Sequence, residues 1–177
     1  MSAFERKEPG EALTDAILEM RRQRHEFLSR LPILRTVDDA ILRERFLALT
    51  RTLTRVLNRF PLRELLGWGY GRLGPRVFLL FNRVRETDAF AQNVADYLRL
   101  ATLWGLFPVE IVSSSASHVE LTYSQCPLGI ESERKLCKAH MAMEPKLSEL
   151  PSFSTRITVL ECFPEGGNRC RLRFVRK

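Results

Sequence analysis

All four cysteines of this chain lie in its last third, at positions Cys126, Cys137, Cys162 and Cys170. If cysteine served only as a small buried apolar residue, it would also occur among the apolar positions of the first 125 residues. The clustering therefore predicts that the four thiols share one site. Four thiolates are the ligand set of a structural Zn²⁺ ion or of a 4Fe–4S cluster, and the sequence does not decide between the two.

The spacing of these cysteines is not diagnostic of a metal, because it forms neither two short Cys-x2-Cys pairs nor a ferredoxin run. Three other interpretations stay open: buried thiols without a metal, one reactive cysteine among inert ones, and disulfides, which a reducing cytoplasm would disfavour. His140 is a further candidate ligand. It follows Cys137 by three residues and would share its face of a helix.

The composition limits the kind of protein to which such a site belongs. Of the 177 residues, 45% are hydrophobic and 28% charged, which is an ordinary globular balance, and a chain of this length can bury a core without help from a metal. No apolar run approaches the roughly 18 residues of a transmembrane helix, and the N-terminus lacks the apolar stretch of a signal peptide. We therefore expect a cytoplasmic protein with no membrane partner.

The net charge of +7 would suit an anionic partner, but the basic residues are spread along most of the chain. Arg51, Arg55 and Arg59 fall four apart and form one basic helical stripe. We interpret this stripe as the solvent-exposed side of an amphipathic helix, with phosphate binding as the alternative. Nucleic acid is not the partner that we expect.

Residues 1–104 are predicted to be mainly helical. Apolar residues recur at helical spacing from Glu11 to Leu31, from the capping residues before Asp39 to Phe60, and from Glu86 to Leu106. A further short helix is predicted over 61–66. The glycines that follow it, in 67–71, indicate a turn rather than a phosphate loop, because no Lys-Ser or Lys-Thr pair comes after them.

Residues 105–177 show the pattern of a small sheet. The segments 109–112 and 119–123 are joined by a run of small polar residues and predict one hairpin. A second hairpin is predicted from 156–162 and 169–175, which a glycine-containing turn connects. If the two hairpins pair into one sheet, the strand ends and the four cysteines meet at one edge.

Between the hairpins, residues 131–150 are predicted to be helical, and Pro145 should end or kink this helix near Glu144. The order of elements predicts an α+β fold, with N-terminal helices packed on a small antiparallel sheet made of two hairpins that flank a helix. No repeat or linker divides the chain, so we expect a single domain over 1–177.

The C-terminal third resembles a known family. Three stretches carry the resemblance: Cys126-Pro127-Leu128-Gly129, Leu136-Cys137-Lys138-Ala139 and 160–174. Over about 103–175 the chain resembles the 4-vinyl-reductase domain superfamily and the related aminothiazoline-carboxylate hydrolase-like family. The resemblance implies a domain that encloses a small apolar or aromatic ligand and holds a metal through cysteines of this segment. Cys137, Cys162 and Cys170 match the metal-site thiols.

The match is not complete at the metal site. Glu161 is the nearest counterpart of the acidic ligand, but it adjoins Cys162, whereas the family pattern places that residue where this chain has Val159. Cys126 would then take the fourth position. Leu172 stands where the family usually has an aromatic residue.

Two function classes follow. The first is a binding or sensory module whose helices enclose an apolar pocket, with candidate lining residues Trp68, Phe78, Phe81, Tyr97 and Trp104. The second is an enzyme, either a small-heterocycle hydrolase or a cluster-dependent reductase; a hydrolase would use Cys126 or Cys137 as nucleophile or a metal-bound water, with His118, His140 or Glu144 as base. We favour the binding module. The sequence does not fix the oligomeric state, and a homodimer is an open alternative.

Overall fold

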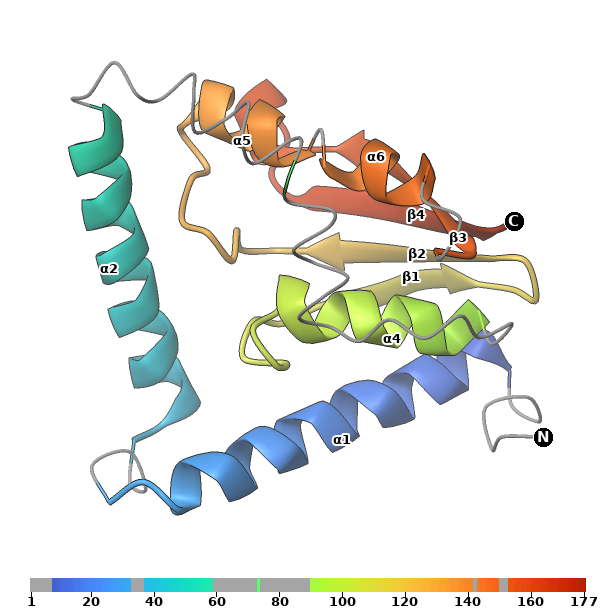
Figure 1. Ribbon diagram of the computed structural model, residues 1–177, viewed down its shortest axis with the longest axis horizontal. Coiled ribbons are helices and arrows are strands. Elements are labelled where there is room, and N and C mark those ends of the chain that lie inside the picture. Colours follow the sequence, from blue (N-terminus) through green and yellow to red (C-terminus); the bar gives the residue numbers. More distant parts are fainter. Residues whose placement is uncertain (1–7, 33–36, 59–72, 74–89, 142, 150–152) are drawn as a thin grey trace.

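The structure is a computed structural model. It describes residues 8–32, 37–58, 73, 90–141, 143–149 and 153–177. These residues form helices and one antiparallel four-stranded sheet, so the predicted α+β fold is confirmed (Figure 1). The predicted helix over 61–66 and the glycine turn over 67–71 lie outside the described residues.

Helix α1 (Pro9–Ser29) begins at a proline, whose fixed backbone angle and missing N–H suit the first turn of a helix. It buries Leu13, Ile17 and Met20, which recur at helical spacing, against α4 (Phe90–Ala101). Helix α4 in turn lies between α1 and the sheet (Figure 1). No helix among the described residues combines the length and apolar character that a bilayer crossing requires.

Helix α2 (Asp39–Asn58) begins where the capping residues predict, and the backbone N–H of Ala40 donates to the Asp38 carboxylate at 2.7 Å. Arg51 and Arg55 are exposed on this helix, as the basic-stripe interpretation requires, whereas Arg59 lies outside the described residues.

Arg24 of α1 is buried and contacts both α2 and the turn that follows α4. Its guanidinium forms an ion pair with Asp39 at the start of α2 and donates to the backbone carbonyl of Trp104 at 2.9 Å. Only 4% of Arg24 is exposed. A buried charge needs such partners, because an unpaired one would be strongly destabilising.

The sheet contains β1 (Glu110–Ser114), β2 (His118–Tyr123), β3 (Thr155–Glu161) and β4 (Cys170–Arg176) in the order β1-β2-β4-β3. The two predicted hairpins are therefore joined through β2 and β4, which run antiparallel. This pairing brings the end of β2, the start of β4 and the end of β3 to the same end of the sheet.

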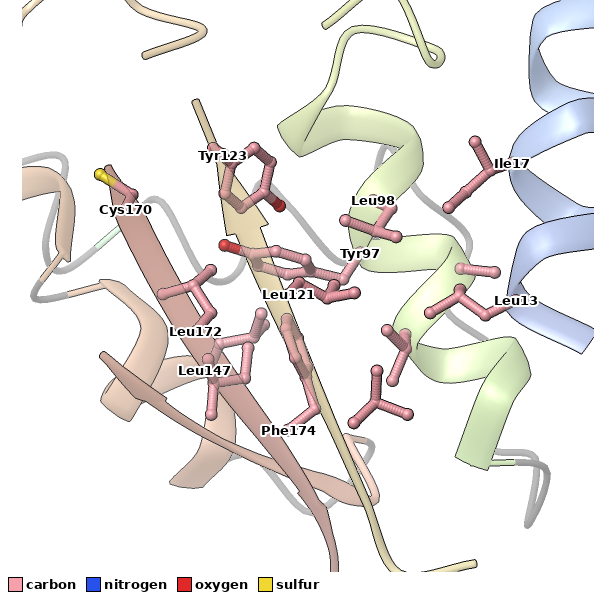
Figure 2. Close-up of a cluster of buried hydrophobic side chains, with 14 of the residues drawn as sticks. Leu13, Ile17, Tyr97, Leu98, Leu121, Tyr123, Leu147, Cys170, Leu172 and Phe174 are labelled. Carbon is pink, nitrogen blue, oxygen red and sulfur yellow. The ribbon is translucent and has the colours of Figure 1, made fainter. Parts of the chain in front are cut away.

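One face of the sheet forms the core with α4 and α6 (Met143–Glu149). Figure 2 shows Leu121 of β2, Phe174 of β4 and Leu98 of α4 meeting there. The rings of Tyr97 and Phe174 contact edge to face, with centroids 5.1 Å apart. On the other face, Glu120 accepts hydrogen bonds from Arg171 and Arg173.

The predicted helix over 131–150 is present as two helices, α5 (Arg134–Met141) and α6. The sequence predicts that Pro145 ends or kinks a helix near Glu144, but this proline lies inside the first turn of α6. A proline is tolerated there because the first N–H groups of a helix have no intrahelical acceptor. Helix α5 ends at Met141, the residue whose carbonyl the ring of Pro145 would meet in a continuous helix, so the break lies close to where the sequence predicts it.

Candidate functional site

The fold brings the four cysteines to one end of the sheet. Cys126 lies in the loop after β2, Cys162 directly follows β3, and Cys170 is the first residue of β4. Cys137 comes from α5, which packs against the short 3-10 turn Phe163–Glu165 that follows Cys162. All four are buried free thiols. The prediction that they meet at one edge of the sheet is confirmed.

The thiols of Cys137 and Cys162 are hydrogen-bonded to each other. Burial, and then the neighbouring thiols, raise the pKa of Cys137 to about 12, and burial is the main cause that raises the pKa of Cys170 to about 12. Burial also raises the pKa of Cys126 and of Cys162. At neutral pH all four are therefore protonated and poor nucleophiles.

The chemistry of these donors suits a soft metal, but their present arrangement is not a coordination site. Among the described residues, no group of three or more His, Cys, Asp or Glu side chains is placed so that it could hold a metal ion. Glu161, the counterpart of the family's acidic ligand, accepts a hydrogen bond from Arg169 at 3.2 Å. The side chain of His140 lies outside what the structure describes.

Carboxylates lie near the thiols: the Glu165 side chain is hydrogen-bonded to Cys162, and Glu131 is close enough to Cys126 to help raise its pKa. His118 begins β2, at the opposite end of that strand from Cys126, and its Nδ1 lies 2.7 Å from the Ser115 hydroxyl. Glu144 is fully buried in α6, and the side chain of His140, the third candidate base, is not described. The raised thiol pKa values count against a hydrolase that uses Cys126 or Cys137 as its nucleophile.

An apolar cavity of about 240 Å³ opens beside the thiols. Three of the four cysteines form part of its wall. The lining residues that the structure describes include no charged side chain; they are Tyr97, Leu100, Ala101, Leu103, Tyr123, Cys126, Pro127, Leu128, Ile130, Cys137, Met141, Cys170 and Leu172. Three of the cysteines thus line a cavity large enough for a small ligand, at the end of the sheet where all four lie.

The predicted pocket residues are only partly found at this cavity. Tyr97 lines it, whereas Trp104 packs against Phe27 with ring centroids 5.9 Å apart and lines a separate groove. Trp68, Phe78 and Phe81 lie outside the described residues.

Three polar side chains lie together next to the cavity, and the sequence alone does not predict that they meet. The Tyr97 hydroxyl donates to Oε1 of Glu144 at 3.2 Å, and burial raises the pKa of Glu144 to about 7. The Tyr123 hydroxyl has no hydrogen-bond partner among the described residues. From the sequence, Tyr123 is only an apolar strand position; its place at the end of a strand, just before a cysteine loop, is the one signal that could have singled it out.

Comparisons with known proteins do not assign this chain to a family. None of the family models, curated proteins or solved structures that were compared with it matches. The resemblance of 103–175 to the 4-vinyl-reductase superfamily therefore stays a prediction that rests on sequence motifs. Function has to be inferred from the cavity and the thiols themselves.

Proposed function

We propose that this protein is a small-molecule-binding or sensory module similar to the 4-vinyl-reductase domains, with its ligand in the cavity beside the thiols. The observation that carries the proposal is the cavity, about 240 Å³ of largely apolar space next to Cys126, Cys137 and Cys170. Protein cores are close-packed and contain few voids larger than a water molecule. A space of this size therefore favours a ligand over a packing defect.

The size and lining of the cavity define the class of ligand. A dry apolar cavity of about 150 Å³ can hold benzene, so this one suits a molecule of one or two rings. A charged ligand would lose its hydration without gaining a counter-ion, because the described lining residues carry no charge. The ligand is accordingly neutral, small, and apolar or aromatic.

Cys126, Cys137, Cys162 and Cys170 are the residues that would hold a Zn²⁺ ion or a 4Fe–4S cluster in this proposal. Their side chains would have to turn toward a common centre, which requires no change in the order of the strands. Thiolate ligation would tie the end of β3, the start of β4 and helix α5 to the cavity wall, and metal binding would add to folding stability. A reducing cytoplasm would keep the thiols available.

An enzyme remains the alternative function. The raised thiol pKa values oppose a cysteine nucleophile, so catalysis would have to depend on a bound metal or cluster. A reductase would need a redox cluster, whereas a structural zinc site would be closed by four thiolates and colourless.

The metal part is tested by metal and sulfide analysis, with a visible spectrum, on protein purified without oxygen. One zinc per chain and no colour supports the structural site; about four irons and four sulfides with a brown colour favours the reductase. Each of the four cysteine-to-serine variants should lose the metal. No metal in the wild-type protein would leave Cys126, Cys137 and Cys170 as part of the cavity wall only.

The ligand part is tested by calorimetric titration with naphthalene, using wild-type protein and two alanine-to-phenylalanine variants. Ala101 lines the cavity at the end of α4, and Ala101→Phe should fill it and abolish binding. Ala116 is exposed in the turn between β1 and β2, so Ala116→Phe should bind like wild type. Binding that survives in Ala101→Phe would place the probe elsewhere and overturn the proposal.

A further inference from the structure

A groove of about 500 Å³ lies where the end of α1, the start of α2 and the turn after α4 meet. Figure 1 shows this turn on the inner side of the corner that α1 and α2 form. The lining of the groove is mostly apolar and includes Phe27, Phe46 and Trp104. Phe27 is 49% exposed and Trp104 is 37% exposed, so large rings stay in contact with water inside a hollow. Apolar surface of this kind, gathered in a concave site, indicates a ligand.

Positive charge exceeds negative charge beside this groove. Arg24, in its wall, forms an ion pair with Asp39. Burial lowers the pKa of Arg24, Asp39 counteracts this effect, and the nearby positive charges of Arg21 and Arg43 lower the pKa further. Two further guanidinium groups thus act on the ion pair of Arg24 and Asp39, and the potential beside the groove is positive.

Arg99, on the last turn of α4, supplies a cation that a ligand can reach. It is exposed and lines the groove. Its side chain has no ion pair or hydrogen bond within the part of the chain that the structure describes. A guanidinium of this kind can bind a carboxylate or sulfonate through two N–H groups, while its carbon stem covers apolar surface.

We infer that this groove binds a small amphiphilic anion, whose apolar body lies over Phe27 and Trp104 and whose carboxylate or sulfonate is held by Arg99. The apolar cavity beside the thiols is a different site, because its described lining has no charge and contains neither Phe27 nor Arg99. The inference therefore does not depend on the proposed function. A second copy of the chain is a poorer occupant, because its own net charge of +7 would add to the positive charge instead of balancing it.

The test uses two fluorescent probes, 8-anilinonaphthalene-1-sulfonate and N-phenyl-1-naphthylamine, which has the same rings but no sulfonate. Each is titrated into wild-type protein, Arg99→Gln and Phe27→Asp, and both substituted positions are exposed. Arg99→Gln should weaken binding of the sulfonate about 3- to 10-fold, the effect of one charge-assisted hydrogen bond that is partly open to water. It should leave binding of the neutral probe unchanged. Phe27→Asp should abolish binding of the sulfonate, because it removes an apolar contact and adds a negative charge.

Arg55→Gln and Leu18→Asp are the matched controls. Arg55 is exposed on α2, Leu18 is 56% exposed on α1, and neither residue lines the groove. Each control makes the same change of charge as the variant it accompanies, and both should bind the sulfonate like wild type.

The inference is overturned if wild type does not bind the sulfonate, if the controls weaken binding as much as their partners do, or if only one of the two groove variants weakens it. A wild-type dimer that Phe27→Asp dissociates, as measured by sedimentation velocity, would mean that a second copy covers the groove, and would overturn it too. If a groove variant does not fold, the salt dependence of wild type decides. A preference for the sulfonate over the neutral probe that falls with rising salt supports the inference, and any other result overturns it.

Discussion

The Tyr97 hydroxyl and the Glu144 carboxylate meet at 3.2 Å inside the core, where Tyr97 is 2% exposed and Glu144 is not exposed at all. The contact joins α4 to α6 across the core face of the sheet. It also places an ionisable group where ionisation is costly, because burial raises the pKa of Glu144 to about 7. The stability of the fold should therefore respond to pH near neutrality.

Glu144→Gln should remove this response. A carboxyl whose pKa is raised on folding gives stability that is fully present below its unfolded pKa of 4.5 and is lost as the pH rises through about 7. The shift corresponds to about 3 kcal/mol between the two limits. Urea unfolding from about pH 5 to about pH 8 should show this loss in wild type and a flatter profile in Glu144→Gln.

The control for that experiment is Glu149→Gln, on the exposed face of the same helix. It should keep the wild-type profile. A Glu144→Gln profile that falls as steeply as that of wild type would mean that another group is responsible for the pH dependence.

Glu120 should have the opposite effect on the pH dependence of stability, with a loss of stability at acidic pH. Hydrogen bonds from Arg171, and then from Arg173, lower the pKa of its carboxyl. A lowered pKa gives stability that is present above the unfolded pKa and is lost as the pH falls through the folded one. Glu120→Gln should therefore be less stable than wild type at neutral pH and should lose less of its stability on acidification, as measured by urea unfolding.

Glu110→Gln is the matched control on the adjacent strand, because Glu110 is exposed. It should unfold like wild type at every pH. If Glu120→Gln matched wild type at neutral pH as well, the two arginine contacts would contribute nothing to stability.

The parts of the fold that depend on local pattern were predictable from the sequence, and the parts that depend on packing were not. Leu13, Ile17 and Met20 marked α1 by their spacing alone, and strand alternation located the two hairpins. The sequence left open whether and how the two hairpins pair; the structure pairs β2 with β4, which brings the cysteines together. The sequence also predicted a helix break near Pro145, but it did not show that a new helix would begin before this proline.

The cavity was harder to predict because its wall comes from segments far apart in the chain. Tyr97, Tyr123 and Met141 reach it from α4, β2 and α5, so its volume depends on how three elements pack. Aromatic residues named as pocket candidates from the sequence alone included Trp104, which packs elsewhere. Whether a hydroxyl such as that of Tyr123 finds a partner is likewise decided by packing.

The thiols should be unreactive in metal-free protein. Because the pKa values of Cys137 and Cys170 are raised to about 12, and those of Cys126 and Cys162 are also raised, the thiolate fraction at neutral pH is very small. Iodoacetamide at about pH 7.5 should label all four more slowly than free cysteine, whose pKa is about 8.5. Mass spectrometry of digested protein measures each site, and urea-unfolded protein is the control. One cysteine that labels rapidly in the folded protein would revive the catalytic-thiol hypothesis.

Gly129, in the loop that forms one wall of the cavity, should be sensitive to substitution. Its φ is +64°, and a Cβ atom there would lie 3.1 Å from the Thr50 hydroxyl oxygen of α2. Gly129→Ala should therefore destabilise the fold by about 1–3 kcal/mol, through the left-handed backbone and the added contact. The loss is measured by urea unfolding.

A double-mutant cycle with Thr50→Ala separates the two causes. Removing the hydroxyl should relieve the contact, so Gly129→Ala should cost about 0.5–1 kcal/mol less in the Thr50→Ala background. Gly166→Ala is the control, because Gly166 also has a positive φ but a Cβ atom there would meet nothing within 4 Å; its cost should not change with Thr50→Ala. Equal costs of Gly129→Ala in both backgrounds would mean that the Thr50 hydroxyl contributes nothing to the loss, which would then come from the backbone and from the Arg51 and Leu47 side chains of α2, 3.2 and 3.3 Å from the added Cβ atom.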